Sequence, residues 1–121
     1  QRGISSSFWV MTATKKDGSF SKDLKYASQS ATTMVILMGI RKFKEIIEEV
    51  SKYRSGLTPF AIIQNGTLKN ESFSIGNISD VSGVIKTLDV SAPGIIVIGD
   101  VVAEHPSFFE EEVQRVLYSS F

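Results

Sequence analysis

The sequence contains no cysteine and only one histidine, His105, among its 121 residues. Without cysteine there is no disulfide and no thiol nucleophile. A zinc site built from clustered cysteine and histidine ligands is also excluded, and we expect no metal site. Catalysis by a serine–histidine pair would depend on His105 alone, and we interpret this histidine as a surface or capping residue.

The sequence also lacks an excess of charge and a long apolar run. Thirteen basic residues balance thirteen acidic ones, and the lysines are scattered along the chain, so nucleic acid is not the expected partner. The longest apolar runs fall far short of the ~20 residues that a membrane span needs. No secretory segment is visible, and together with the missing cysteines this favours a cytoplasmic location.

The length and composition fit one globular domain. A chain of 121 residues with 42% hydrophobic and 21% charged residues can bury a single core. The chain begins at Gln1 and not at methionine, inside a segment that leads into a predicted strand. We therefore expect it to be an excised piece of a longer protein, with residues 1–121 forming one domain.

The pattern of apolar residues predicts alternating strands and helices. Clusters of β-branched and aromatic residues predict strands at 8–13, 33–38, 60–64, 73–75 and 95–102, the fourth returning antiparallel to the third. Helical spacing predicts helices at 43–53, at 81–88 with Ser79 as the N-cap, and from 107 to the end of the chain. The polar stretch around Asp17 and Gly18 is expected to be a loop. The fold class is α/β, with a mixed sheet flanked by helices.

No common catalytic motif is present, but three turns follow predicted strands. These turns are Met38-Gly39, Asn65-Gly66-Thr67 and Gly99-Asp100. Ligands of open α/β sheets bind beyond the carboxyl ends of strands, where glycine permits close approach to the backbone. The alternative is that these glycines only make turns. A run of three glutamates near the end of the chain, at a predicted helix start, is explained by the helix dipole.

Four blocks of sequence, in this order, resemble the C-terminal half of uroporphyrinogen-III C-methyltransferases, which are tetrapyrrole methylases. The first ends in Leu-Met-Gly, as the matching strand of that family does. The second contains the Pro-x-Ala-x-x-x-Asn-Gly-Thr pattern, the third is Gly-Asn-Ile, and the fourth runs from Ser-Ala-Pro-Gly to Val-Val. Their residues are 33–39, 58–67, 76–78 and 91–102. The similarity extends from about Arg2 to Val102, whereas Ala13 replaces the glycine of a family Thr-Gly-His motif and residues 104–121 have no counterpart.

The resemblance implies a fold of two α/β halves that form the active site in the cleft between them, in a homodimer. The N-terminal half, absent from this chain, holds the family's catalytic candidates, so no catalytic residue is assigned here. Met38 and Gly66 match positions that contact S-adenosylmethionine, and Pro93 is a further candidate for the same wall.

The activity that the resemblance implies is methyl transfer from S-adenosylmethionine to two pyrrole-ring carbons of uroporphyrinogen III, a tetrapyrrole. The product would feed sirohaem and cobalamin synthesis, and no metal is required. The isolated chain is expected to be inactive. Two alternatives stay open: another tetrapyrrole methylase, such as a precorrin methyltransferase, or a non-catalytic α/β association module.

Overall fold

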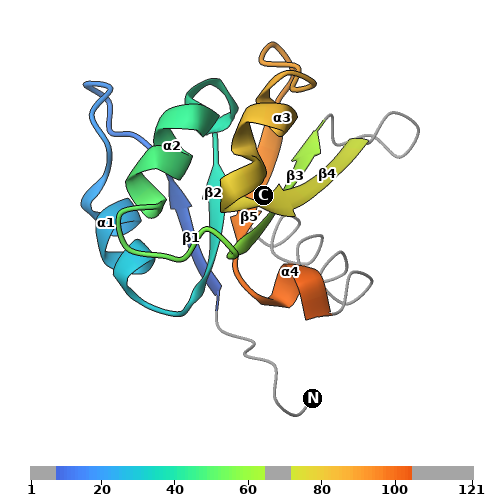
Figure 1. The fold of residues 1–121 in the computed structure, drawn as a ribbon. Helices are drawn as coiled ribbons and strands as arrows, with labels where there is room; N and C mark the ends of the chain where they lie inside the picture. The colour runs from blue at the N-terminus through green and yellow to red at the C-terminus, as the bar shows by residue number, and fades with distance from the viewer. Residues whose placement is uncertain (1–7, 65–71, 105–121) are drawn as a thin grey trace.

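The fold is built on one five-stranded mixed sheet (Figure 1). A computed structural model of the chain describes residues 8–64 and 72–104. The strand order is β1-β2-β5-β3-β4, with β1 parallel to β2 and β5 antiparallel to both of its neighbours. The strands are β1 (Phe8–Thr12), β2 (Thr33–Leu37), β3 (Pro59–Gln64), β4 (Ser72–Asn77) and β5 (Gly94–Ile98). The predicted mixed α/β sheet and the antiparallel β3–β4 pair are confirmed.

The helices cover the two faces of the sheet unequally. Side chains of α1, α2 and α3 pack with Ile36, Phe60 and Ile96 on one face, whereas α4 packs with Val35 and Val97 on the other. Figure 1 shows α1, α2 and α3 together in front of the sheet. The helices are α1 (Lys22–Gln29), α2 (Phe43–Val50), α3 (Val81–Ile85) and α4 (Val101–Glu104), with 3₁₀ turns η1 (Ile40–Lys42) and η2 (Ile78–Asp80).

The central strands are buried on both faces, as their continuous apolar runs predict. In β2, Met34 and Ile36 belong to the cluster under α1 and α2, and Val35 between them belongs to the cluster under α4. Phe43 of α2 meets Phe60 of β3 edge to face, with ring centroids 5.3 Å apart. These contacts fix α2 across the middle of the sheet, directly after the end of β2.

The helix α1 was not predicted from the sequence, which suggested a loop there. Its buried side chains are only Leu24, Ala27 and Ser28, so its apolar face is too narrow to give a clear helical period. The helix forms because Ser21 caps it, its hydroxyl accepting a hydrogen bond from the Leu24 amide at 3.4 Å.

Several predicted boundaries were wrong, among them the end of the helix predicted at 43–53, which lies at Val50. The strand predicted at 95–102 ends at Ile98, because Gly99 turns the chain with φ +156° and α4 begins two residues later. Ser79 does not cap a helix; Asn77 and Asp80 form a capping box at η2 instead. The helix predicted to reach residue 88 ends at Ile85. The predicted last helix and the turn at 65–67 lie outside the described residues.

Candidate functional site

One edge of the sheet brings together two of the three predicted site residues. Because β1, β2 and β3 run in the same direction, their carboxyl ends lie at one edge, together with the amino end of β5. Met38 follows β2 directly and Pro93 precedes β5 directly. Because Leu37 pairs with Ile95, Met38 and Pro93 lie at the ends of neighbouring strands. The edge formed by these strand ends is here called the Met38 edge.

The third predicted site residue, Gly66, lies outside the described residues. In the sequence it comes two positions after Gln64, the last residue of β3. The Gly99-Asp100 turn, the third turn that follows a predicted strand, does not lie at this edge. Since β5 is antiparallel to β2 and β3, its carboxyl end lies at the opposite edge of the sheet.

Met38 combines a strained backbone with an exposed apolar side chain. Its φ is 57°, and among the described residues it is the one non-glycine with positive φ. This left-handed conformation costs a residue with a Cβ about 1–2 kcal/mol. Its side chain is 82% exposed, more than any other large hydrophobic side chain in the described ranges. An exposed apolar side chain contributes little to the fold, and backbone strain of this kind is typical of functional sites.

The packing of Gly39 explains why the chain turns at Met38. A Cβ on Gly39 would lie 2.8 Å from Cδ1 of Ile46 and 3.1 Å from Cγ2 of Ile36. The backbone therefore lies directly on the core between β2 and α2, a close approach that only glycine permits. With Gly39 packed inward, Met38 is left outside the core.

Gln64 holds the turn that leads into β5. Its side chain is buried, and its amide Nε2 donates to the carbonyl oxygens of Asp89 at 2.6 Å and Ala92 at 3.3 Å. Its Oε1 accepts from the Asp89 amide at 3.4 Å. The Asp89 carboxylate accepts from the Ser91 hydroxyl at 2.6 Å and the Ser91 amide at 3.0 Å, which lowers the pKa of Asp89. Sequence reasoning missed Gln64, although a polar residue that ends an apolar strand was visible.

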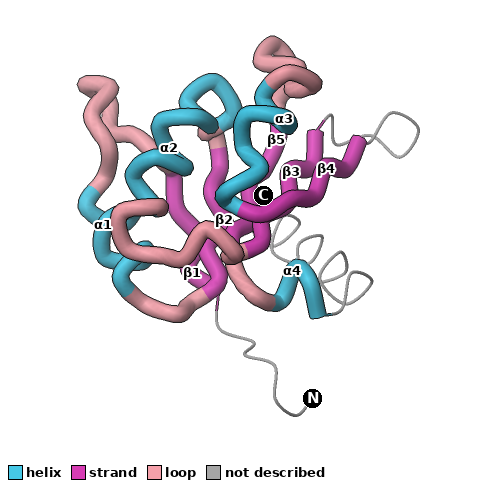
Figure 2. Tube along the Cα trace, in the orientation of Figure 1, coloured by secondary structure: helices cyan, strands magenta, loops and turns pink. Residues whose placement is uncertain are grey.

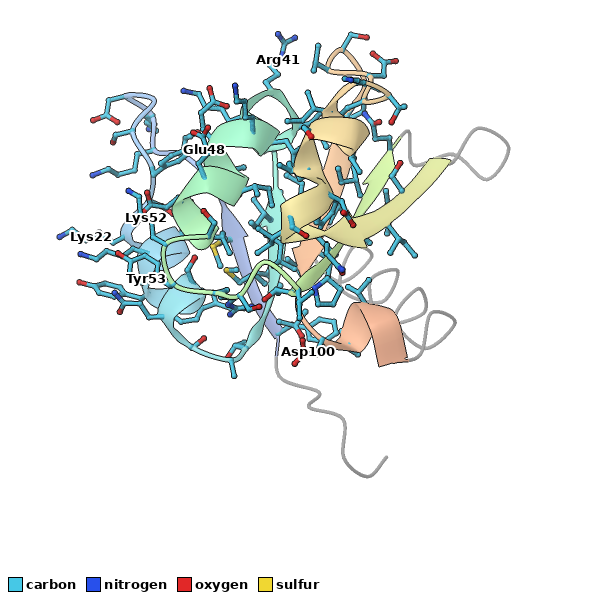
Figure 3. All side chains as sticks on the ribbon, in the orientation of Figure 1. Lys22, Arg41, Glu48, Lys52, Tyr53 and Asp100 are labelled. Carbon is cyan, nitrogen blue, oxygen red and sulfur yellow. The ribbon has the colours of Figure 1, made fainter. Side chains whose placement is uncertain are left out.

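Exposed cations lie in the loops at the Met38 edge. Figure 2 shows the loop after β1 and the loop before β5 rising at the same edge, at the top of the view. Lys15 and Lys16 lie in the first of these loops, and Arg41 and Lys42 follow Met38 closely. Arg41 is labelled at the top of Figure 3, where it points away from the sheet. This edge therefore presents an apolar side chain with several positive charges nearby.

The opposite edge carries a polar pocket in which the side chain of Arg54 is hydrogen-bonded to backbone carbonyl oxygens. Figure 3 places Asp100 at this edge, at the bottom of the view. The half-buried Arg54 donates from Nε and Nη2 to the carbonyl oxygens at the end of α1 and the turn that follows it. Burial lowers the pKa of Arg54, while Asp100 opposes that effect. The pocket is lined by Ser30, Ala31, Arg54, Ser55, Thr58 and Asp100.

The described ranges contain neither a cluster of metal-ligating side chains nor a membrane-spanning helix. Within residues 8–64 and 72–104, no group of three or more His, Cys, Asp or Glu side chains is arranged to hold a metal ion. In the same part of the chain, no helix is both long and apolar enough to cross a membrane.

Comparison with known proteins identifies the family. Residues 1–82 match the family described as tetrapyrrole (corrin/porphyrin) methylases. The chain is 35% identical over 103 residues to a uroporphyrinogen-III C-methyltransferase of Methanocaldococcus jannaschii, covering 84% of this chain and 43% of that relative. It is also 35% identical over 92 residues to a siroheme synthase of Pseudoalteromonas translucida, covering 75% of this chain and 19% of that protein.

The fold is also that of a solved structure. The uroporphyrin-III C-methyltransferase of Thermus thermophilus, complexed with S-adenyl homocysteine, matches with a TM-score of 0.71 at 21% identity. The match covers 87% of this chain and 47% of that one, so the chain spans less than half the length of these methyltransferases. The family predicted from the sequence is confirmed, and this chain belongs to the tetrapyrrole methylases.

Proposed function

We propose that this chain forms one wall of the S-adenosylmethionine site in a uroporphyrinogen-III C-methyltransferase. Met38, Gly66 and Pro93 are the proposed contacts. The observation that carries the proposal is Met38, a residue with a strained backbone whose apolar side chain is exposed and belongs to neither hydrophobic cluster. Support comes from the relative that bears this enzyme name and from the structural neighbour that was solved with S-adenyl homocysteine.

The chemistry of the Met38 edge fits such a cofactor. The adenine ring of the cofactor is flat and has two apolar faces, and the thioether side chain of methionine is a flexible, polarisable surface for such a face. The inward packing of Gly39 keeps the Met38 side chain outside the core and available to a ligand. Ligand binding beyond the carboxyl ends of β2 and β3 also agrees with the general rule for open α/β sheets.

The work of these residues is alignment and exclusion of water. When bound, S-adenosylmethionine supplies an activated methyl group. The residues of this chain would hold it in one orientation, because productive alignment of donor and acceptor contributes much of the rate enhancement. No residue of this chain is proposed as a catalyst, and no metal is required.

The proposed acceptor is uroporphyrinogen III, a tetrapyrrole with several carboxylate side chains. The exposed cations Lys15, Lys16, Arg41 and Lys42 at the Met38 edge are suited to such an anionic substrate. The names of the relatives favour this substrate and its place in sirohaem synthesis. Methylation of a precorrin by the full-length protein, with no turnover of uroporphyrinogen III, would favour the alternative that another tetrapyrrole is the substrate.

We also propose that the full-length protein is a homodimer. Val10 of β1 and Ile75 of β4 pair with Val35 and Ala61, so both lie on the sheet face covered by α4. Their side chains are 39% and 48% exposed, which leaves apolar surface at both outer strands that a second copy can cover. A monomer in sedimentation at high concentration would remove this proposal. The cytoplasmic location stays a prediction.

The test of the cofactor site is Met38→Gly in the full-length protein. Glycine adopts a φ of 57° without strain, so the variant keeps the fold and loses only the side chain. We expect the Kd for S-adenosylhomocysteine, measured by calorimetry, to rise about tenfold or more, equivalent to about 1.4 kcal/mol of lost contact.

The matched control is Leu57→Ala at the opposite edge of the sheet. Leu57 is also a large apolar residue with a highly exposed side chain, and it lies just before the start of β3. This variant is expected to bind S-adenosylhomocysteine as the wild type does. Unchanged affinity in Met38→Gly would show that Met38 is not a cofactor contact.

A further inference from the structure

We propose that Gln64 is a positioning residue for the cofactor wall. It ties the turn at residues 89–92 to the end of β3 and so sets where β5 begins beside Met38. The inference rests on the proposed function of this edge. It adds a residue that does not itself touch the ligand but controls the part of the backbone that does.

The hydrogen bonds of Gln64 define the tie. One amide group bridges three backbone atoms of the turn, since Nε2 reaches the carbonyl oxygens of Asp89 and Ala92 and Oε1 accepts from the Asp89 amide. The turn has its own bonds as well, because Ala92 donates to the Asp89 carbonyl at 3.1 Å and Ser91 donates to the Asp89 carboxylate. The internal bonds shape the turn, and Gln64 fixes it to the sheet.

Packing at Gly94 passes this constraint on to Met38. Gly94 pairs with Gln64 across β5 and β3, and a Cβ at Gly94 would lie 2.8 Å from the Ile63 carbonyl oxygen and 3.0 Å from Cδ1 of Ile40. Ile40 is only two residues after Met38. A shift of the turn would therefore move the start of β5 against the segment that holds Met38, while Pro93 lies between the turn and β5.

A residue needed only to fill buried space would not have to be a primary amide. A side chain of similar size, such as methionine, would fill the same buried space. The amide is distinguished by its donors, which face two carbonyl oxygens. Replacing Nε2 with a carboxylate oxygen keeps size and shape but sets a negative oxygen against those carbonyls.

The experiment compares Gln64→Met and Gln64→Glu in the full-length protein. Binding of S-adenosylhomocysteine is measured by calorimetry, and folding is checked by circular dichroism. We expect Gln64→Met to raise the Kd about threefold to tenfold and Gln64→Glu to raise it further, because small displacements of positioning groups have large effects. Wild-type affinity in both variants would overturn the proposal.

The matched control is Arg54→Met, which also removes hydrogen bonds from a side chain to carbonyl oxygens, but at the opposite edge. It should lower stability and leave the Kd within about twofold of the wild type. If Arg54→Met weakened binding as much as Gln64→Met does, the effect would be one of general stability and the positioning role would be refuted.

A second measurement separates this proposal from the proposed function. Hydrogen exchange in the ligand-free protein reports on the tie without any ligand, since the Asp89 amide donates to Gln64 itself and the Ala92 amide donates within the turn that Gln64 holds. Faster exchange in both Gln64 variants supports the tie even if the wild type fails to bind S-adenosylhomocysteine, a result that would sink the proposed function. Unchanged exchange would show that Gln64 does not hold the turn.

Discussion

Arg54 closes the connection between α1 and β2 with four hydrogen bonds from one side chain. Its Nε donates to Ser28 at 3.1 Å, and its Nη2 donates to Ala27, Ser30 and Thr32 at 2.8, 2.7 and 2.7 Å. All four acceptors are backbone carbonyl oxygens at the end of α1 or in the turn that follows it, where helical hydrogen bonding runs out. The Ala27 carbonyl also accepts from the Ser30 amide at 3.1 Å. A cation there also interacts favourably with the helix dipole.

We expect Arg54→Met to lower the free energy of unfolding by about 2–3 kcal/mol, because charged hydrogen bonds are lost and half-buried carbonyls are left unpaired. Urea denaturation measures the change. The control is Lys52→Met, two residues away, which removes an exposed ion pair to Glu49 and should change stability by about 0.5 kcal/mol or less. Equal losses in the two variants would contradict this role of Arg54.

The sequence predicted some of these residues and not others, for physical reasons. Met38 was predicted from the resemblance, but its backbone conformation depends on how tightly Gly39 packs against Ile46 and Ile36. Arg54 comes directly after the helix predicted at 43–53. Its acceptors belong to α1, which sequence periodicity did not predict, so its partners could not be named. The hydrogen-bond partner of Gln64, Asp89, lies 25 residues away in the chain. A local sequence pattern therefore could not identify it.

At the scale of elements, close packing between β5 and β3 depends on Gly94. In Gly94→Ala the new Cβ would lie 2.8 Å from a backbone carbonyl oxygen, which cannot move without separating the two strands. We expect this variant to lose about 1–3 kcal/mol of stability, as overpacked sites do. Thermal or urea unfolding is the measurement.

Gly83 provides a control, because its replacement by alanine is expected to raise stability and not to lower it. It lies within α3, and no atom comes within 4 Å of the position that its Cβ would take. Alanine is favoured over glycine in helices, so Gly83→Ala should raise stability by about 0.5–1 kcal/mol. A loss of stability in Gly83→Ala, or none in Gly94→Ala, would show that the contacts at these two glycines have been wrongly assigned.

At the scale of the whole molecule, strand direction decides which of the turns that follow predicted strands can lie together. The apolar run of β5 predicts a buried strand but carries no information about its direction. Direction depends on the connection from α3, where the turn at 89–92 returns the chain to the Met38 edge. The local pattern therefore predicted the strand but could not show that the turn at Gly99 and Asp100 lies at the edge opposite Met38.

The two hydrophobic clusters share the same strands, so they are expected to unfold together. Alternate residues of β2, β3 and β5 belong to the cluster under α1, α2 and α3 and to the cluster under α4. Loss of one cluster would expose a face of the strands on which the other depends. This arrangement is expected of a single domain over residues 8–64 and 72–104, and one domain over residues 1–121 stays a prediction. The chain spans only 43% of its archaeal relative.

The chain contains two hydrophobic clusters that share three strands, but it spans less than half the length of its relatives. We expect the isolated 121-residue chain to unfold in a single urea transition, with tryptophan fluorescence and far-ultraviolet circular dichroism giving the same midpoint. The same sample should show no turnover of uroporphyrinogen III and weaker binding of S-adenosylhomocysteine than the full-length protein. The reason is that a wall at one edge of a sheet supplies only part of the surface that a buried ligand needs. Separate midpoints would refute the single domain, whereas turnover by the isolated chain would show that its own residues include the catalytic ones.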